Sequence, residues 1–280
     1  MLLLNGDCLE LMKTLPDKSI DLFICDLPYG CLTGGGGKEK ARRLNNKGEM
    51  RMNESGKIFG CSWDIKIDLD KFWEQVERLM KNEHTPIIQF CNTRFGNDLI
   101  NSKPKWFRYD LVWSKSNGVG FLSANKQPLR SHENIYVFSK KGANYNRVDI
   151  LGDFKGTSQG HGRAGGDVNA IKNYKGCYGE KAVITHHTRE GIRCVKSVIE
   201  VSKKKARGEH PTAKPIDLYK FLIERYSKEG DMVLDPTFGS GNSGRACAEL
   251  KRKYTGIEMN EKFFNSYNNE TFSQAYLGVI

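Results

Sequence analysis

The sequence of 280 residues has no long apolar run, and no stretch approaches the roughly 18 consecutive apolar residues that a membrane-spanning helix needs. Its mean hydropathy is −0.57. The start of the chain turns polar after three leucines and lacks the basic segment of a secretory signal peptide. These absences lead us to expect a cytoplasmic protein with no membrane partner.

The spacings of metal and disulfide sites are also missing. No two of the eight cysteines form a C-x-x-C pair, and the six histidines form no H-x₃₋₅-H pair beside cysteines. Structural zinc sites typically show such spacings, and we expect neither a zinc cage nor a disulfide framework. Cys25 and Cys247 lie inside apolar runs, where a free thiol behaves as a small hydrophobe. We therefore predict no bound metal.

Acidic residues are too few to balance the basic ones, since 33 Asp and Glu stand against 44 Lys and Arg, for a formal net charge of +11. This excess favours an anionic partner. Much of it lies in residues 140–209, where 15 basic residues accompany 7 acidic ones, and a second basic, glycine-rich stretch spans 33–57. We interpret 140–209 as an inserted region. For any single charge in either segment, a solvated surface loop is the alternative.

What the chain does have is an alternation of short apolar runs and amphipathic stretches, typical of a mostly parallel sheet covered by helices. Strands are predicted at residues 2–4, 20–25, 86–90, 107–113, 134–138, 232–234 and 254–257. Helices are predicted at 69–80, 216–226 and 243–250. The predicted fold class is α/β, with one doubly wound, mostly parallel sheet of seven strands.

A glycine-rich turn follows the strand predicted at 232–234. Gly239, Gly241 and Gly244 satisfy G-x-G-x-x-G, and Glu258 ends the next strand, 23 residues after Asp235. Glycines permit a tight turn close to a ligand, and an acidic residue at this distance can bind ribose hydroxyls. The pattern predicts a nucleoside-containing cofactor, and the alternative is an ordinary strand-to-helix turn.

The position of this turn narrows the choice of cofactor. Only 22 residues follow Glu258, too few for the further βα units of a dinucleotide-binding fold. The rest of the sheet must then come from upstream, so we predict a permuted chain order with the catalytic half first. Asp235 would repel a pyrophosphate, but it suits the amino group of an amino-acid-bearing cofactor.

The strand predicted at 20–25 delivers Asp26, Leu27, Pro28 and Tyr29 at its carboxyl end, where open α/β sheets bind ligands. The exocyclic amine of a nucleobase is a poor nucleophile because its lone pair is delocalised into the ring. Acceptors such as the Asp26 carboxylate and the Leu27 carbonyl can hold its N–H groups and make it competent. Tyr29 can stack on a base extruded from a duplex. The alternative is a strand ending in a proline turn, with Tyr29 as packing.

Four segments resemble motifs of the β-class amino-group DNA methyltransferases, and they follow one another along the chain in the order typical of that class. Residues 26–29 look like the D-P-P-Y catalytic motif, and residues 235–241 look like the D-P-F-x-G-S-G motif for S-adenosylmethionine. Residues 210–215 are similar to H-P-T-x-K-P, and residues 5–8 match N-G-D-C. The resemblance covers most of the chain. It implies a Rossmann-like methyltransferase fold, S-adenosylmethionine as the cofactor, and double-stranded DNA as the partner.

Carried over residue by residue, the resemblance implies that Asp26 accepts a hydrogen bond from the target amine and that Tyr29 stacks on the flipped base, with Leu27 and Pro28 completing the catalytic motif. It assigns the cofactor's adenine amine to Asp7 and its ribose to Glu258. The residues implied in cofactor binding are Asp7, Cys8, Thr212, Lys214, Asp235, Thr237, Gly239, Ser240, Gly241, Asn242 and Glu258. Of these, Asp235 and the 239–241 backbone would line the methionine moiety, and Lys214 and Thr212 would place its carboxylate.

The chain departs from the family pattern at three places. Leu27 stands where the family usually has proline, which matters little if the acceptor is a main-chain carbonyl. Asn242 and Ser243 replace a Thr-Thr pair, and residues 34–57 follow the catalytic motif as an insertion. Segments 113–115 and 126–133 look like a phage and prophage branch of the family.

The resemblance also implies that residues 140–209 recognise the target sequence, in agreement with their charge excess. The predicted domains are thus a catalytic half at 1–139, the recognition region at 140–209 and a cofactor-binding half at 210–280. The cations that we assign to DNA contact are Lys115, Arg130, Lys155, Arg163, Lys172 and Lys175.

An aspartate at the first position of the catalytic motif favours N6 of adenine in this family, whereas serine is commoner for N4 of cytosine. The prediction is therefore a site-specific adenine-N6 DNA methyltransferase of restriction-modification or phage type. N4-cytosine transfer is the first alternative, and a non-catalytic DNA-binding protein that retains the fold is the second. An RNA or small-molecule methyltransferase is the third. A homodimer and a cognate restriction enzyme are left open.

Overall fold

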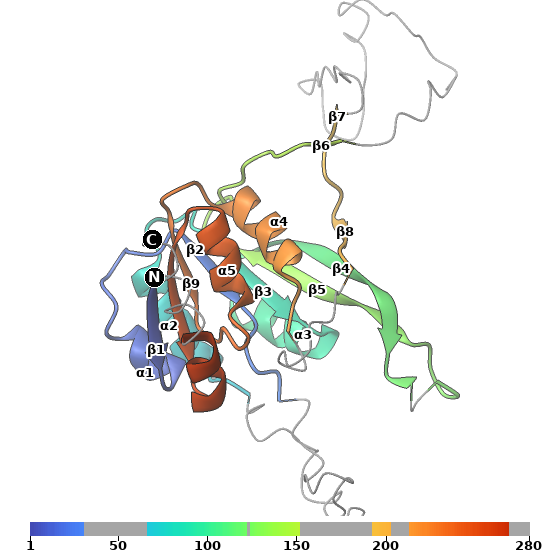
Figure 1. Ribbon diagram of the computed structural model, residues 1–280, viewed down its shortest axis with the longest axis horizontal. Coiled ribbons are helices and arrows are strands. Elements are labelled where there is room, and N and C mark those ends of the chain that lie inside the picture. The colour runs from blue at the N-terminus through green and yellow to red at the C-terminus, as the bar shows by residue number, and fades with distance from the viewer. Residues whose placement is uncertain (31–65, 122–123, 152–191, 203–212, 269–280) are drawn as a thin grey trace, which may run out of the picture. The chain divides into compact units, whose positions relative to one another are not determined.

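The structure, a computed structural model, describes residues 1–30, 66–121, 124–151, 192–202 and 213–268 (Figure 1). In chain order the elements are β1 (Leu2–Asn5), α1 (Cys8–Met12), β2 (Leu22–Cys25), α2 (Leu69–Leu79), β3 (Ile87–Cys91), α3 (Thr93–Ser102), β4 (Phe107–Val119), β5 (Arg130–Phe138), β6 (Ile150–Leu151), β7 (Ile192–Arg193), β8 (Val198–Glu200), α4 (Ile216–Tyr226), β9 (Met232–Asp235), α5 (Asn242–Glu249) and β10 (Lys253–Glu258). Within these ranges no helix is both long and apolar enough to cross a bilayer.

An eight-stranded sheet has the order β1-β10-β9-β2-β3-β5-β4-β8. Its strands are parallel from β1 to β3, β5 is antiparallel to both of its neighbours, and β8 is parallel to β4. The mostly parallel α/β sheet is confirmed, and all seven predicted strands belong to it. The predicted count is one short because β8 has only three residues, of which Ile199 alone is buried. Three residues are too few to show the alternation of apolar and polar side chains by which a strand is predicted from sequence.

The three predicted helices are present as α2, α4 and α5. The Asp68 carboxylate caps α2 by accepting a hydrogen bond from the Lys71 N–H at 3.2 Å, and Phe72, Val76 and Leu79 are buried along one side of the helix. Helices α1 and α3 were not predicted. The first has only five residues, and the second begins at an Asn92 cap whose side chain accepts from the Phe95 N–H at 2.8 Å.

The chain divides into two compact units, one made of residues 1–146 with 197–280 and the other of residues 147–196. The first unit holds the eight-stranded sheet. In the second, the structure describes the antiparallel pair of β6 and β7. The inserted region predicted at 140–209 is thus wider than the separate unit, since residues 140–146 and 197–202 belong with the sheet. Its role in target recognition stays a prediction.

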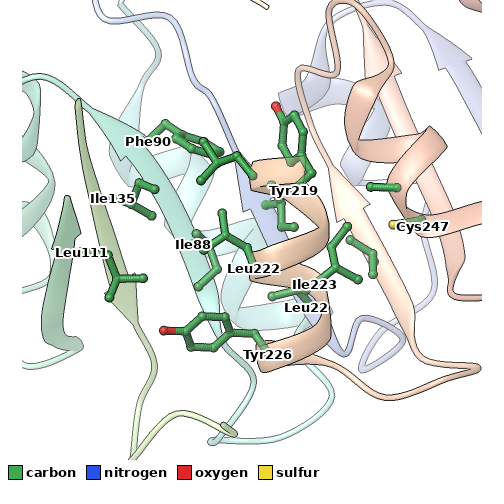
Figure 2. Packing of buried hydrophobic residues seen from close by; sticks show 14 of the residues in the cluster. Leu22, Ile88, Phe90, Leu111, Ile135, Tyr219, Leu222, Ile223, Tyr226 and Cys247 are labelled. Carbon is green, nitrogen blue, oxygen red and sulfur yellow. The ribbon is translucent and has the colours of Figure 1, made fainter. Parts of the chain in front are cut away.

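Alternation along the strands gives the sheet two apolar faces. On one face Leu22 and Ile88 pack against Leu222 of α4 and Cys247 of α5 (Figure 2). On the other face Phe23 joins a cluster that includes side chains of α1, α2 and α3. Helices therefore cover both faces, as the predicted doubly wound fold requires, and α4 and α5 lie on the same side in Figure 1. A slip of one residue would exchange the two faces, so their burial fixes the register.

The order of the strands creates a switch point between β9 and β2. From β9 the chain moves through α5 to β10 on one side, and from β2 it moves through α2 to β3 on the other. Crossovers that depart in opposite directions leave a crevice at the carboxyl ends of the two central strands, where open α/β sheets bind ligands. Asp235 ends β9, and Asp26 follows β2 directly. The two predicted motifs therefore meet at the switch point.

Candidate active site

Asp26 is held by hydrogen bonds from three directions. The Tyr29 hydroxyl donates to its Oδ1 at 2.7 Å, and the Lys214 ammonium donates to its Oδ2 at 2.5 Å. The backbone carbonyl of Asp26 accepts from the Thr237 hydroxyl at 3.1 Å. Because Thr237 lies in the glycine-rich turn, this last bond joins the catalytic motif to the cofactor motif. The structure thus brings together two segments that the sequence separates by about 200 residues.

Tyr29 is fixed by its ring as well as by its hydroxyl. The ring stacks on Phe95 of α3, with centroids 5.1 Å apart and an angle of 26° between the planes. Burial and the nearby Asp26 carboxylate raise the pKa of Tyr29 well above its ordinary value, so the phenol remains a donor at neutral pH. Because Phe95 covers one face of the Tyr29 ring, a flipped base would have to stack on the opposite face. That stacking stays a prediction.

Lys214 lies between two carboxylates. Its side chain is 4% exposed, and its Nζ is 2.5 Å from Asp26 Oδ2 and 3.4 Å from Glu133 Oε2. Burial alone would lower the pKa of Lys214, but the charges of Asp26 and Glu133 outweigh it and raise the pKa above its ordinary value. The resemblance implies a contact with the cofactor's carboxylate, and the structure shows this ammonium engaged with Asp26.

The glycine-rich turn is open at one position and covered at the next. At Gly239, whose φ is +53°, the nearest atom to an added Cβ would be the Thr237 carbonyl oxygen, 4.0 Å away. Gly241 has a φ of +76°, and there an added Cβ would lie 2.2 Å from the Tyr267 ring. An added Cβ at Gly244 would lie 2.2 Å from the Tyr267 hydroxyl. Gly241 and Gly244 thus serve close packing, whereas Gly239 leaves its side of the turn accessible.

Asp235 faces into the protein and is 1% exposed. Its Oδ1 accepts from the Thr237 N–H at 3.0 Å, and its Oδ2 accepts from the Ser243 hydroxyl at 2.6 Å. Burial raises the pKa of Asp235 to about 7 although both of these hydrogen bonds favour the charged form. In the structure Asp235 therefore braces the turn, and a contact with the cofactor's amino group stays a prediction.

The raised pKa of Asp235 makes stability depend on pH. Between the ordinary value of 3.8 and about 7, the folded state binds more protons than the unfolded state, so stability falls as pH rises through this range. Asp235→Asn should remove this slope and gain up to about 4 kcal/mol relative to wild type at pH 8. Urea unfolding of both proteins at pH 4.5 and pH 8 measures the effect. Asp98→Asn, at an exposed ion pair, is the control. A difference between Asp235→Asn and wild type that does not change with pH would contradict this expectation.

Three loops meet around Glu258 at the end of β10. Its carboxylate accepts from the Gly239 N–H at 2.9 Å and from the Asn260 N–H at 2.7 Å. Its backbone carbonyl accepts from the Gly6 N–H at 3.1 Å and from the Asn5 side chain at 2.8 Å. The carboxyl end of β1, the glycine-rich turn and Glu258 are thereby neighbours, as the resemblance implies for a site that holds a nucleoside.

Asp7 caps α1 with one oxygen, since its Oδ1 accepts from the Leu9 N–H at 2.7 Å and the Glu10 N–H at 3.3 Å. Its exposed Oδ2 forms no hydrogen bond with the described residues and can accept from an adenine amine. Burial raises the pKa of the adjacent Cys8 thiol to about 12, so this thiol stays protonated. Asn242 donates to the Lys214 carbonyl at 2.8 Å, and the Ser240 carbonyl accepts from Arg245 at 2.8 Å. Both residues therefore shape the turn through contacts within the chain.

The cations assigned to DNA fall into two groups. Lys115 forms an ion pair with Glu133 and lies over the Trp113 ring, 4.9 Å from its centroid. Arg130 donates through Nε to the His132 carbonyl at 3.1 Å. The residues that lie outside the described ranges are Lys155, Arg163, Lys172 and Lys175, together with Thr212 of the cofactor set. Contacts of all these cations with DNA stay predictions.

Sequence reasoning did not find Glu133 or Tyr267. Glu133 ends the segment 126–133 that resembles a branch of the family, but no role was assigned to it, and Tyr267 follows β10 outside every motif. The described residues contain no group of three or more His, Cys, Asp and Glu side chains arranged to hold a metal ion.

Most of the chain matches a known family. The family model of the N6/N4 DNA methylases matches residues 20–269. The chain belongs to this family. Among curated relatives, Type II methyltransferase M.HinfI of Haemophilus influenzae is 26% identical over 94% of the methylase and 66% of its own length. Type II methyltransferase M.Cfr9I of Citrobacter freundii is 25% identical, and the match covers 93% of the methylase and 84% of that relative's own length.

Solved structures agree on the fold. The M1.HpyAVI–SAM complex matches with a TM-score of 0.55 and 18% identity, covering 96% of the methylase and 98% of that chain. The PvuII DNA methyltransferase, described as cytosine-N4-specific, matches with a TM-score of 0.58 and 16% identity. This match covers 94% of the methylase and 83% of that chain. These matches confirm the Rossmann-like methyltransferase fold predicted from the motifs.

Proposed function

We propose that the methylase transfers a methyl group from S-adenosylmethionine to the exocyclic N6 amine of adenine in double-stranded DNA, at a specific site. The observation that carries the proposal is the 3.1 Å hydrogen bond between the Thr237 hydroxyl and the Asp26 carbonyl. This bond supports the proposal because it ties Asp26, the proposed acceptor for the target amine, to the turn that the family resemblance assigns to the cofactor. This is the arrangement that methyl transfer requires, because donor and acceptor must be held in close contact.

The residues at the site fit S-adenosylmethionine. The free oxygen of Asp7 suits an adenine amine, Glu258 lies where ribose hydroxyls are bound in related folds, and the open side of Gly239 admits a ligand close to the backbone. When bound, S-adenosylmethionine supplies an electrophilic methyl group on a sulfonium. The charge of Asp235 suits the methionine amino group only if the cofactor reaches its buried carboxylate, so we assign that residue chiefly to the turn.

The catalytic work of the chain is to position the target amine and stabilise its charge. The Asp26 carboxylate and the Leu27 carbonyl accept hydrogen bonds from the two N–H groups, which draws the nitrogen lone pair out of the ring. When the nitrogen gains the methyl group, the bond from that methyl group to the sulfonium would break and leave a neutral thioether, and the nitrogen would become positively charged and then lose one proton. The Asp26 carboxylate stabilises that positive charge and is the side chain that we propose accepts the proton. Pro28 restrains the backbone between Leu27 and Tyr29.

Adenine is proposed rather than cytosine because aspartate occupies the first position of the catalytic motif. Double-stranded DNA is proposed because of the family and the formal charge of +11. The test is to incubate the full chain with labelled S-adenosylmethionine and unmethylated duplex DNA, digest the DNA to nucleosides and identify the labelled species. We expect N6-methyladenine. Labelled N4-methylcytosine would overturn the choice of base, and DNA binding without any label would favour a non-catalytic role.

A further inference from the structure

Four charged side chains form a continuous row at the catalytic end of the sheet. Asp26 pairs with Lys214, Lys214 also pairs with Glu133, and Glu133 pairs with Lys115. Their side chains are between 4% and 23% exposed. The row has alternating sign and equal numbers of positive and negative groups. So regular an arrangement of poorly solvated charges calls for an explanation beyond stability, because buried ion pairs contribute little net stability.

The row is assembled from four separate parts of the chain. Asp26 follows β2, Lys214 precedes α4, Glu133 lies on β5 and Lys115 lies on β4. The backbone of Lys214 is tied to α5 by the hydrogen bond from Asn242 to its carbonyl. The ammonium group lies 5.1 Å from the centroid of the Phe90 ring, an apolar neighbour that contributes no hydrogen-bonding group.

The carboxylate of Asp26 is therefore oriented by two donors, one on each oxygen. Tyr29 is rigid, because its ring is stacked on Phe95. Lys214 is a flexible chain of four methylene groups, and one ion pair would leave its ammonium free to turn about Asp26. Glu133 attracts the same ammonium through a longer ion pair, in which its Oε2 is 3.4 Å from Nζ, against 2.5 Å for Asp26 Oδ2. The two attractions together fix the ammonium position.

Glu133 is suited to this part because it stays charged. Burial would raise the pKa of Glu133, yet the positive charges of Lys214 and Lys115 more than compensate and hold it below its ordinary value. Lys115 thus neutralises one side of Glu133 and leaves the other side to face Lys214.

We propose that Glu133 and Lys214 are positioning residues that fix the plane of the Asp26 carboxylate, so that its remaining lone pairs meet the target amine. This inference rests on the proposed function, in which Asp26 accepts hydrogen bonds from that amine. It assigns Lys214 to Asp26 in place of the cofactor's carboxylate, and it gives Glu133 a role through Lys214 rather than a contact with substrate.

The test compares Glu133→Gln, Lys214→Met and the double variant with wild type in the full chain. We expect each single variant to lower kcat at least tenfold at saturating cofactor, with the Kd for S-adenosylmethionine and for duplex DNA within threefold of wild type. Because Glu133 acts through Lys214, the double variant should be no slower than Lys214→Met alone. The matched control is Glu77→Gln, since Glu77 also bridges two lysines, Lys103 and Lys140, on the surface. Its kcat should equal that of wild type.

Two results would overturn the proposal. A large loss of cofactor affinity with kcat retained at saturation would make Lys214 a cofactor ligand, and multiplicative losses in the double variant would make Glu133 independent of Lys214. If Glu133→Gln fails to fold, Glu133→Asp decides, because it keeps the charge but withdraws it by one methylene group. We expect an intermediate kcat for Glu133→Asp, and a wild-type value would contradict the proposal.

The identity of the wild-type product separates this inference from the proposed function. The ratios of kcat among variants test the positioning role whichever base is methylated. If wild type transfers no methyl group at all, the proposed function fails. The ion pairs of Lys214 with Asp26 and Glu133 can then still be tested by NMR of the lysine ammonium groups. A paired, buried ammonium exchanges its protons slowly, so the Lys214 signal should be visible in wild type and weakened in Glu133→Gln. Equal signals in the two proteins would overturn the inference.

Discussion

Asp26→Asn is expected to lower kcat for methyl transfer by about 10²- to 10⁴-fold, while the affinity for S-adenosylmethionine stays near that of wild type. Asparagine keeps the shape of the side chain but loses the negative charge that, in the proposed mechanism, stabilises the methylated nitrogen and takes its proton. Its amide group can also present a donor where the target amine needs an acceptor. Single-turnover measurements with saturating cofactor and duplex DNA give the rate, and calorimetric titration gives the cofactor affinity.

The effect must be separated from loss of a buried ion pair. Asp26→Asn leaves Lys214 paired with Glu133, so the ammonium keeps one partner within 3.4 Å. Asp98→Asn is the matched control, because Asp98 pairs with Lys66 at 2.8 Å on the surface and loses the same charge. Its activity should be unchanged. An Asp26→Asn protein that transfers methyl groups at the wild-type rate would remove Asp26 from the catalytic role.

Gly241→Ala is expected to cost about 2 to 5 kcal/mol of unfolding free energy, which is large beside the stability of an ordinary domain. Two causes act together. The φ of +76° is unfavourable for any residue with a Cβ, and the new methyl group would lie 2.2 Å from the Tyr267 ring. The ring atoms cannot withdraw easily, since Tyr267 is buried and also packs on Phe238 with centroids 5.4 Å apart. Urea unfolding of the protein without cofactor measures the loss.

Gly230→Ala separates the two causes. Gly230 has a similar φ of +84°, but an added Cβ there would meet nothing within 4 Å. The Gly230→Ala variant should lose only about 1 to 2 kcal/mol of unfolding free energy, which is the cost of the backbone conformation alone. Adding Tyr267→Ala to Gly241→Ala should cost less than the same change in wild type, because it relieves the clash. Equal losses at Gly241 and Gly230 would show that Tyr267 yields without cost.

Local patterns predicted the elements well where those patterns were long. The helix at 216–226 was predicted with the bounds that α4 has, because a proline precedes it and apolar residues recur along it. Helix α3 was missed because only Phe95 and Leu99 mark its buried side, and Gly96 interrupts its interior. That glycine is explained by tertiary packing, since an added Cβ would lie 2.7 Å from the Tyr136 ring of β5.

The glycines of the glycine-rich turn have two different roles, ligand access and close packing. Their spacing predicted a close approach of a ligand to the backbone, and Gly239 remains open to one. Gly241 and Gly244 are instead covered by Tyr267, a residue that follows β10. No sequence rule links a tyrosine at that position to the third residue of the motif. Only packing shows that part of the motif serves the fold.

The sequence by itself determined the family, the α/β class, the order of the catalytic and cofactor motifs, and the residue types at the carboxyl ends of the central strands. The family follows from the resemblance of four motifs in order, and the α/β class follows from periodicity and short spacings, which are local along the chain. The tertiary structure decided which side chains meet: Lys214 reaches Asp26 across 188 residues, and Glu133 reaches Lys214 from another strand. Strand order brings such residues together, and a flexible lysine acquires a single position only when charges from separate elements hold it there.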